Sequence, residues 1–255
     1  MKTGAKFKTK LIQDIPFIVT TQVKEMSAVC CALIETGEMG VVYGEPGVGK
    51  TLTAEAISQK WQKRSSPKAV YLEADVGSTP SGIAKKVLRS MADLRPANAA
   101  DATRIIENLT RESHWDLLII DEAERLNHHS LEMLRSIYDR TRVPILLIGM
   151  FELVRHLRSH KKFYSRIGIS YKYEPLSFHQ LSGYLSNLHP LLADIEENDE
   201  KTLLDFIYKT TRGEFRRINR LVKQAERVQK ANNHPVLSLS VFESASELLL
   251  NVDPL

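Results

Sequence analysis

Residues 39–51 read MGVVYGEPGVGKT, a short apolar run that passes directly into a loop with three glycines, a lysine and a threonine. A helical pattern follows from Leu52 to Trp61. A strand, a glycine-rich loop and a helix in this order form a P-loop, whose backbone amides and helix N-terminus bind phosphates. We therefore predict an ATP site here, with Lys50 on the outer phosphates and Thr51 on Mg²⁺. The predicted nucleotide contacts are Gly44, Glu45, Pro46, Gly47, Val48, Gly49, Lys50, Thr51 and Leu52.

A second motif, WDLLIIDE at residues 115–122, is an apolar strand that ends in two acids. Asp121, at the carboxyl end of this strand, would hold Mg²⁺, and Glu122 would polarise the attacking water. In the alternative reading, Asp121 only caps the next helix. The second acid favours ATP hydrolysis over nucleotide storage, so the chain is predicted to be an ATPase.

Short apolar runs alternate with helical patterns over the first part of the chain. The expected strands are residues 40–43, 69–72, 117–120, 145–148 and 171–176. Such alternation predicts an α/β three-layer sandwich with a central five-stranded parallel sheet. Beyond Pro190 we expect helices only, at residues 200–209, 214–231 and 240–250. The predicted domains are a basic N-terminal arm at residues 1–20, a nucleotide-binding domain at 21–190 and a small all-helical lid at 191–255.

Composition excludes several other classes of protein. The two cysteines, Cys30 and Cys31, are adjacent and have no zinc-type spacing. No apolar run is long enough for a membrane span, and the N-terminal stretch lacks an apolar signal core. We therefore expect a cytoplasmic protein that does not associate with a membrane. The formal charge of +4 is compatible with an acidic polymer as partner if the positive groups cluster.

The ordered series PFIVTTQVKEM, GEPGVGKT, LLIIDEAERL, VPILLIGM, FYSRIGI and RGEFRRINRLV resembles the AAA+ ATPases that select DNA targets in transposition, such as the Mu B protein, TnsC, TniB and, more distantly, IstB. This resemblance runs from about Pro16 to Val228. It implies an AAA+ fold, Mg²⁺-dependent ATP hydrolysis and self-assembly into a homo-oligomeric ring or helical filament.

The resemblance also implies further site residues. Arg166 would be an arginine finger that completes the ATP site of a neighbouring subunit; the alternative is a surface arginine in a basic stretch. Arg216 would be the lid sensor that contacts nucleotide, with Arg217 as the other candidate. After residues 145–148 the family places a polar sensor, whereas this chain has Gly149 and Met150. Methionine is a weak hydrogen-bonding group, which predicts slow hydrolysis unless another side chain serves.

Two basic regions are candidates for contact with DNA. The loop at residues 75–81 and the helix after it hold four predicted DNA-binding residues, which are Thr79, Ser81, Lys85 and Lys86. Five cations recur at helical spacing in the lid, which are Arg216, Arg220, Lys223, Arg227 and Lys230. Either set has a solvated helix face as its alternative, and the lid set would also fit an acidic protein segment.

The first functional hypothesis is therefore an ATPase that oligomerises on duplex DNA, largely independently of sequence, selects targets for DNA transposition and recruits or activates the transposase. A helicase-loader-like ATPase is one alternative, which binding of single-stranded rather than duplex DNA would favour. A nucleotide-switched scaffold for protein assembly is the other, which absence of DNA binding would favour.

Overall fold

The computed structural model describes residues 18–62, 68–92, 98, 101–102, 104–108, 115–188, 197–232 and 236–249. These residues form two compact units. The first unit is Gln22–Glu174, and the second contains the described residues from Pro175 onward together with residues 18–21. Most of the expected basic arm at residues 1–20 lies outside the described residues.

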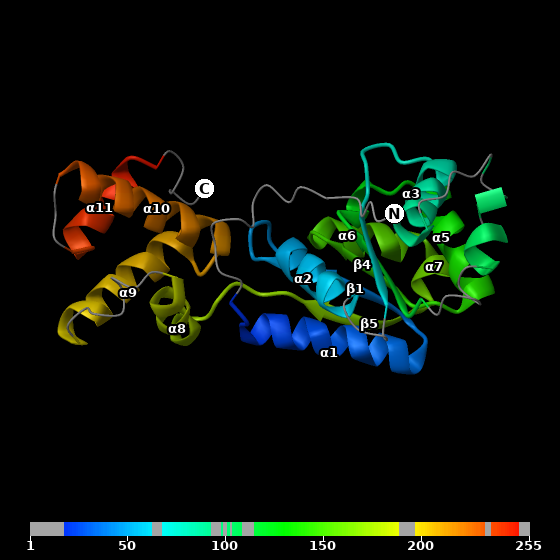
Figure 1. Cartoon of the computed structure of the whole chain (residues 1–255), viewed down its shortest axis with the longest axis horizontal. Coiled ribbons are helices and arrows are strands. Elements are labelled where there is room, and N and C mark those ends of the chain that lie inside the picture. Colours follow the sequence, from blue (N-terminus) through cyan, green and yellow to red (C-terminus); the bar gives the residue numbers. More distant parts are fainter. Residues whose placement is uncertain are drawn as a thin grey trace, which may run out of the picture. The chain divides into compact units, whose positions relative to one another are not determined.

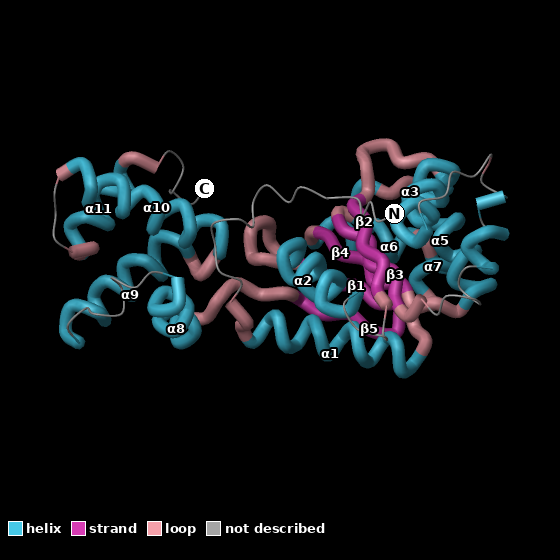
Figure 2. The backbone as a smooth tube through the Cα atoms, in the orientation of Figure 1, coloured by secondary structure: helices cyan, strands magenta, loops and turns pink. Residues whose placement is uncertain are grey.

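A five-stranded sheet forms the centre of the first unit (Figure 2). Its strands are β1 (Met39–Tyr43), β2 (Ala69–Glu73), β3 (Leu117–Asp121), β4 (Ile145–Gly149) and β5 (Ile167–Lys172). They lie in the order β2-β3-β4-β1-β5, and every neighbouring pair is parallel. The order places β4 between β1, which leads into the P-loop, and β3, which carries the two acids.

Helices cover both faces of this sheet (Figure 1). The helices of the first unit with described bounds are α1 (Thr21–Thr36), α2 (Lys50–Gln62), α3 (Pro80–Ala92), the short 3-10 helix η1 (Ala123–Arg125), α5 (His128–Thr141), α6 (Phe151–Ser159) and α7 (Lys161–Tyr164). Residues 101–102 and 104–108 are also helical. Alternate residues of β3 enter two separate cores: Ile119 packs with α1 and α2, while Ile120 packs with α3, α5, α6 and α7. This is the predicted three-layer sandwich, because side chains of a strand alternate between faces.

The last strand differs from its prediction. We expected residues 171–176, whereas β5 is Ile167–Lys172. It is an edge strand whose side chains alternate between half-buried and exposed, while β3 and β4 are buried throughout. An edge strand need not be a continuous apolar run. In β5, Ile167, Ile169 and Tyr171 alternate with glycine, serine and lysine, so the strand lacks the continuous run on which the prediction relied.

The second unit contains four described helices, which are α8 (Phe178–Leu188), α9 (Glu197–Thr211), α10 (Phe215–Ala231) and α11 (Leu239–Glu247). The three helices expected beyond Pro190 are α9, α10 and α11. This unit begins at Pro175, not near residue 190, since Leu181, Tyr184 and Leu185 of α8 pack into the helical core. Among the described residues, no helix is both long and apolar enough to cross a membrane.

Candidate nucleotide site

The P-loop joins the end of β1 to the start of α2. Gly47 and Gly49 have φ angles of 82° and 106°, a region that side chains with a Cβ rarely adopt. Helix α2 begins at Lys50, so its unpaired backbone amides face the loop. Both features are those required for a phosphate cradle, because a helix N-terminus carries partial positive charge.

Lys50 is held inside this loop. Its side chain is buried, and Nζ donates to the carbonyl oxygens of Gly44 and Glu45, each at 2.8 Å. An ammonium group in this position can exchange carbonyl contacts for phosphate oxygens of a bound nucleotide. The Lys50 ammonium group therefore lies inside the loop, and its role in binding phosphate stays a prediction.

Asp121 is buried at the end of β3, with 2% of its surface exposed. Its Oδ1 accepts from the Glu122 amide at 2.8 Å, and its Oδ2 accepts from the Tyr71 hydroxyl at 3.1 Å. Burial, followed by the charge of Asp121, raises the pKa values of Glu55 and Tyr71. Glu73 lies in register with Asp121 on β2, so several acidic groups converge at this edge of the sheet.

This acidic edge fits Mg²⁺. Mg²⁺ is bound through one or two protein oxygens together with nucleotide phosphates and water, so it needs no complete protein cage. Thr51 supplies an exposed side chain in the first turn of α2, and Asp121 supplies a carboxylate. Within the described residues no three His, Cys, Asp or Glu side chains form a cluster suited to a metal ion. One hydroxyl and one carboxylate would suit a Mg²⁺ ion that takes its other ligands from nucleotide phosphates and water, and this assignment stays a prediction.

Glu122 follows Asp121 in the left-handed backbone region, with φ 52°. Its carboxylate forms an ion pair with Arg125, and Arg125 also contacts the Glu73 carboxylate at 3.1 Å. Burial and the negative charge of Glu73 raise the pKa of Glu122, while Arg125 opposes this effect. Arg125 thus orients the predicted base, a role that the sequence analysis missed although the i, i+3 spacing within DEAER is visible.

The sensor position has a steric reason for its glycine. A Cβ added to Gly149 would lie 2.2 Å from Oε2 of Glu124 and 2.9 Å from a methyl of Leu153. Met150 follows with 39% of its surface exposed and precedes α6. The end of β4 therefore cannot carry a larger side chain at residue 149 without moving its neighbours.

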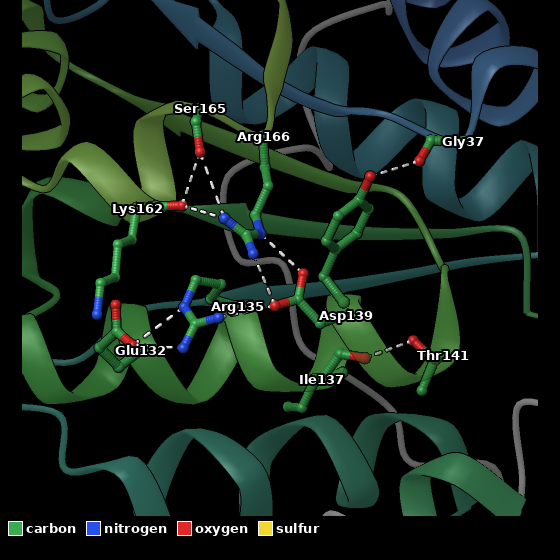
Figure 3. A network of polar contacts seen from close by, with 10 residues as sticks. Gly37, Glu132, Arg135, Ile137, Asp139, Thr141, Lys162, Ser165 and Arg166 are labelled. Atoms are coloured by element: carbon green, nitrogen blue, oxygen red, sulfur yellow. Dashed lines mark hydrogen bonds and ion pairs between the residues drawn. The ribbon is translucent and has the colours of Figure 1, made fainter.

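Arg166 lies in an ion-pair network of its own chain (Figure 3). Nε and one terminal nitrogen donate to the two Asp139 oxygens at 2.7 and 2.9 Å, and the other terminal nitrogen contacts the Lys162 carbonyl and Ser165 Oγ. Asp139 also accepts from Arg135 at 2.7 Å. Hydrogen bonds and charge from Arg166 lower the pKa of Asp139. The finger assignment stays a prediction, and it requires Arg166 to leave Asp139.

The predicted DNA-binding loop is partly occupied by internal contacts. Lys86 Nζ lies 2.6 Å from the Asp75 carboxylate and donates to the Glu73 carbonyl at 2.8 Å. Thr79 Oγ1 accepts from the Gly82 amide at 3.1 Å, so it caps the first turn of α3. Lys85 is exposed. Lys86 therefore offers less uncompensated charge to DNA than the sequence suggested, and the DNA-binding role of this loop stays a prediction.

Ser81 lies partly buried in the same first turn of α3. In the second unit, Arg217 contacts the Glu214 carboxylate at 2.7 Å, whereas Arg216 is exposed and forms no ion pair with a described residue. This difference favours Arg216 as the side chain that remains available to nucleotide. The sensor role of either arginine stays a prediction.

Comparisons with known proteins support an ATP-binding domain in this chain. Residues 34–157 match the family model described as an AAA domain. A Staphylococcus aureus protein described as "Potential ATP-binding protein" is 28% identical over 261 residues, which cover 92% of this chain and 96% of that protein.

The solved structures that are similar to the chain include the following three. The ORC2 protein of Aeropyrum pernix superposes with a TM-score of 0.72 at 19% identity, and the match covers 92% of this chain and 70% of the ORC2 chain. The ORC1 protein of the same organism, solved in complex with DNA, has a TM-score of 0.64 at 17% identity and coverage of 91% and 66%. The RuvB branch migration motor of Thermotoga maritima has a TM-score of 0.61 at 23% identity and coverage of 91% and 70%. The chain thus has the AAA+ P-loop α/β fold with a helical C-terminal region.

Proposed function

We propose that the protein is an ATPase that hydrolyses ATP between the P-loop and Glu122. The observation that carries this proposal is the strand order, in which β4 separates β1 from β3. Two inter-strand spacings place the P-loop strand and the acidic strand about 9–10 Å apart. That distance leaves room for a terminal phosphate and an attacking water between them.

Each residue has a distinct role in the proposed reaction. Lys50 and the loop amides bind the phosphates, and Thr51 and Asp121 would hold Mg²⁺, which neutralises charge on the phosphates when bound. Glu122 accepts a proton from the attacking water, and its raised pKa brings it closer to the operating pH of a base. Arg166 of a neighbouring subunit would add positive charge to the transition state.

We further propose that the ATP-bound form assembles on duplex DNA and serves DNA transposition by selecting targets and recruiting or activating a transposase. The ordered motifs and their resemblance to transposition ATPases support this role. A structural neighbour solved with DNA is compatible with it, although the low identity supports only the fold. The proposed cofactors are ATP and Mg²⁺.

The first test is negative-stain imaging with and without duplex DNA, in Mg²⁺ and a slowly hydrolysed ATP analogue. Filaments or rings that require both ligands would support the proposal. Preference for single-stranded DNA would favour a helicase loader, and monomers indifferent to DNA would favour a protein scaffold.

Two variants test the chemistry in parallel. Glu122→Gln keeps the shape of the side chain but removes the base, so we expect ATP-bound assemblies that persist. Arg166→Ala should bind ATP normally and lose turnover. Normal turnover by the Arg166 variant would show that this residue is not the finger.

A further inference from the structure

Helix α10 concentrates the positive charge of the chain. It carries six basic residues and one acidic residue, a net charge of +5, whereas the whole chain has a formal net charge of +4. Apart from this helix, the protein is therefore close to neutral. Arg217 is paired with Glu214, and Arg216 belongs to the proposed nucleotide site. The remaining four cations form the lid stripe, defined as Arg220, Lys223, Arg227 and Lys230.

The lid stripe occupies one face of α10. Successive members are separated by three or four residues, which places all four within an arc of about 80° over a length of about 15 Å. The opposite face is buried in the helical core, through Ile218, Leu221, Val222 and Ala225. The core therefore holds α10 in one rotation, with the stripe directed away from it.

All four stripe residues are exposed. None of them forms an ion pair with a carboxylate among the described residues, and the one hydrogen bond recorded for the stripe is a long contact of 3.4 Å from Arg227 to the Gln224 amide. Like charges at this spacing repel one another along a helix. Glu226, four positions before Lys230, is the one acidic residue of α10, so this row of four mutually repelling cations has a single acidic neighbour on its own helix.

The surroundings of the stripe indicate the kind of partner. None of the large apolar side chains that the described residues expose lies on α10; those of the second unit are Val19, Val236 and Leu248. The centre of a protein–protein interface is apolar and poor in lysine, so the stripe lacks what a protein partner would use. Duplex DNA presents a charge about every 1.7 Å along its axis and needs cations rather than apolar contacts.

We propose that the lid stripe is a binding surface for the phosphate backbone of duplex DNA. This inference rests on the proposed DNA-dependent function but assigns the contact to the second unit, apart from the loop at residues 75–81. Phosphate contacts of this kind carry no sequence information, so the surface would hold DNA of any sequence.

The test measures the salt dependence of binding to a fluorescein-labelled, mixed-sequence duplex by anisotropy, with Mg²⁺ and a slowly hydrolysed ATP analogue. The stripe variant changes all four residues to Gln, a residue of similar helix propensity. Each lost phosphate contact should reduce the slope of log K against log salt by about 0.9, or about 3.6 in total. A contribution of that size corresponds to roughly a 100-fold loss of affinity between 50 and 200 mM salt.

The matched control changes four exposed cations of α6 and α7 to Gln, which are Arg155, Arg158, Lys161 and Lys162. It removes the same charge from another surface, so its slope should change by less than one phosphate contact. Circular dichroism of both variants checks that the helices are retained.

The outcomes separate the stripe from the proposed function. If wild type binds DNA and the stripe variant keeps its slope, the stripe assignment is overturned while DNA binding stands. An equal loss of slope in the control would show a general effect of charge and also overturn the assignment. No binding of DNA by wild type would overturn both proposals. If the stripe variant loses binding to poly-glutamate but keeps its DNA slope, the surface serves an acidic protein segment instead.

Discussion

Replacing Asp139 by Asn should destabilise the first unit, because Asp139 links two arginines. The carboxylate accepts two hydrogen bonds from Arg166 and one from Arg135, while Arg135 keeps its separate contact with Glu132 at 2.8 Å. The three linked side chains are only 25–30% exposed, so solvent screens these contacts less than those of a fully exposed pair. Asn preserves the shape but leaves two guanidinium groups side by side without the intervening negative charge.

The size of the effect follows from the type of contact. An exposed ion pair contributes roughly 0.2–1 kcal/mol, and bidentate charge-assisted hydrogen bonds lie at or above the upper end. Two such pairs share Asp139, so we expect a loss of about 1–2 kcal/mol. For a domain of this size, 1 kcal/mol corresponds to about 2–4 °C in melting temperature. Thermal and urea unfolding at pH 7 would measure the change.

The pH dependence gives a sharper test of the same contact. Hydrogen bonds from Arg166 lower the pKa of Asp139 in the folded protein. A carboxylate with a depressed pKa contributes stability above its unfolded pKa of about 3.9, and that contribution is lost as pH falls through the folded value. The difference between wild type and Asp139→Asn should therefore stay constant from pH 5 to 8 and shrink below about pH 4.

Glu107→Gln is the matched control for Asp139→Asn. The Glu107 carboxylate is 22% exposed, but it has one arginine partner, Arg140, which lies at 3.1 Å and is 60% exposed. The same change from carboxylate to amide should cost less than about 0.5 kcal/mol there. If Asp139→Asn unfolds like this control, or if its deficit does not shrink in acid, then Asp139 does not hold Arg166 as the structure indicates.

Two further predictions concern the acidic edge and the histidines of α5 and its neighbours. Tyr71→Phe removes the hydroxyl that donates to Asp121 and should raise the Mg²⁺ concentration needed for half-maximal ATPase activity by about tenfold. Tyr171→Phe removes a hydroxyl that donates to Glu25 of α1 instead, and should leave that concentration unchanged. Nδ1 of His160 lies 2.8 Å from Nδ1 of His128. Burial and the neighbouring histidines lower the pKa of His160 from its usual 6.5. Its neutral form is favoured in the folded state, so stability should fall as pH drops below about 6.5, and His160→Asn should flatten that fall in melting temperature.

The sequence predicted those strands and helices whose apolar residues recur at a regular spacing. The strands β1 to β4, the P-loop and the acidic end of β3 each combine a local pattern with a chemical requirement, so they can be recognised without tertiary contacts. The boundary of the second unit was expected near residue 190, after α8, because the helical spacing of Leu181, Tyr184 and Leu185 does not show which core the helix joins. Edge strand β5 was displaced for a related reason, since half-burial leaves only a weak apolar signal.

Polar pairs between different elements of the fold were beyond the reach of sequence patterns. Arg166 and Asp139 are separated by 27 positions, and their contact depends on how α5 and α7 pack. Lys86 and Asp75 are closer in sequence, yet their pairing depends on the turn between β2 and α3. Tyr71 contacts Asp121 only because β2 lies beside β3. Composition gives the number of charges, whereas only the fold determines which are compensated.

That distinction changes how the cations of this protein should be interpreted. Lys86 and Arg166 were chosen from the sequence as contacts to DNA and ATP, but each already has a carboxylate partner in the structure. Either residue must give up that partner before it can act on another molecule, so its new contact must be stronger than the old one. The lid stripe, from Arg220 to Lys230, has no such partner among the described residues, and a polyanion can bind it without breaking an ion pair there. Electrostatic encounter with DNA should therefore begin at α10, and contacts that require rearrangement should follow assembly.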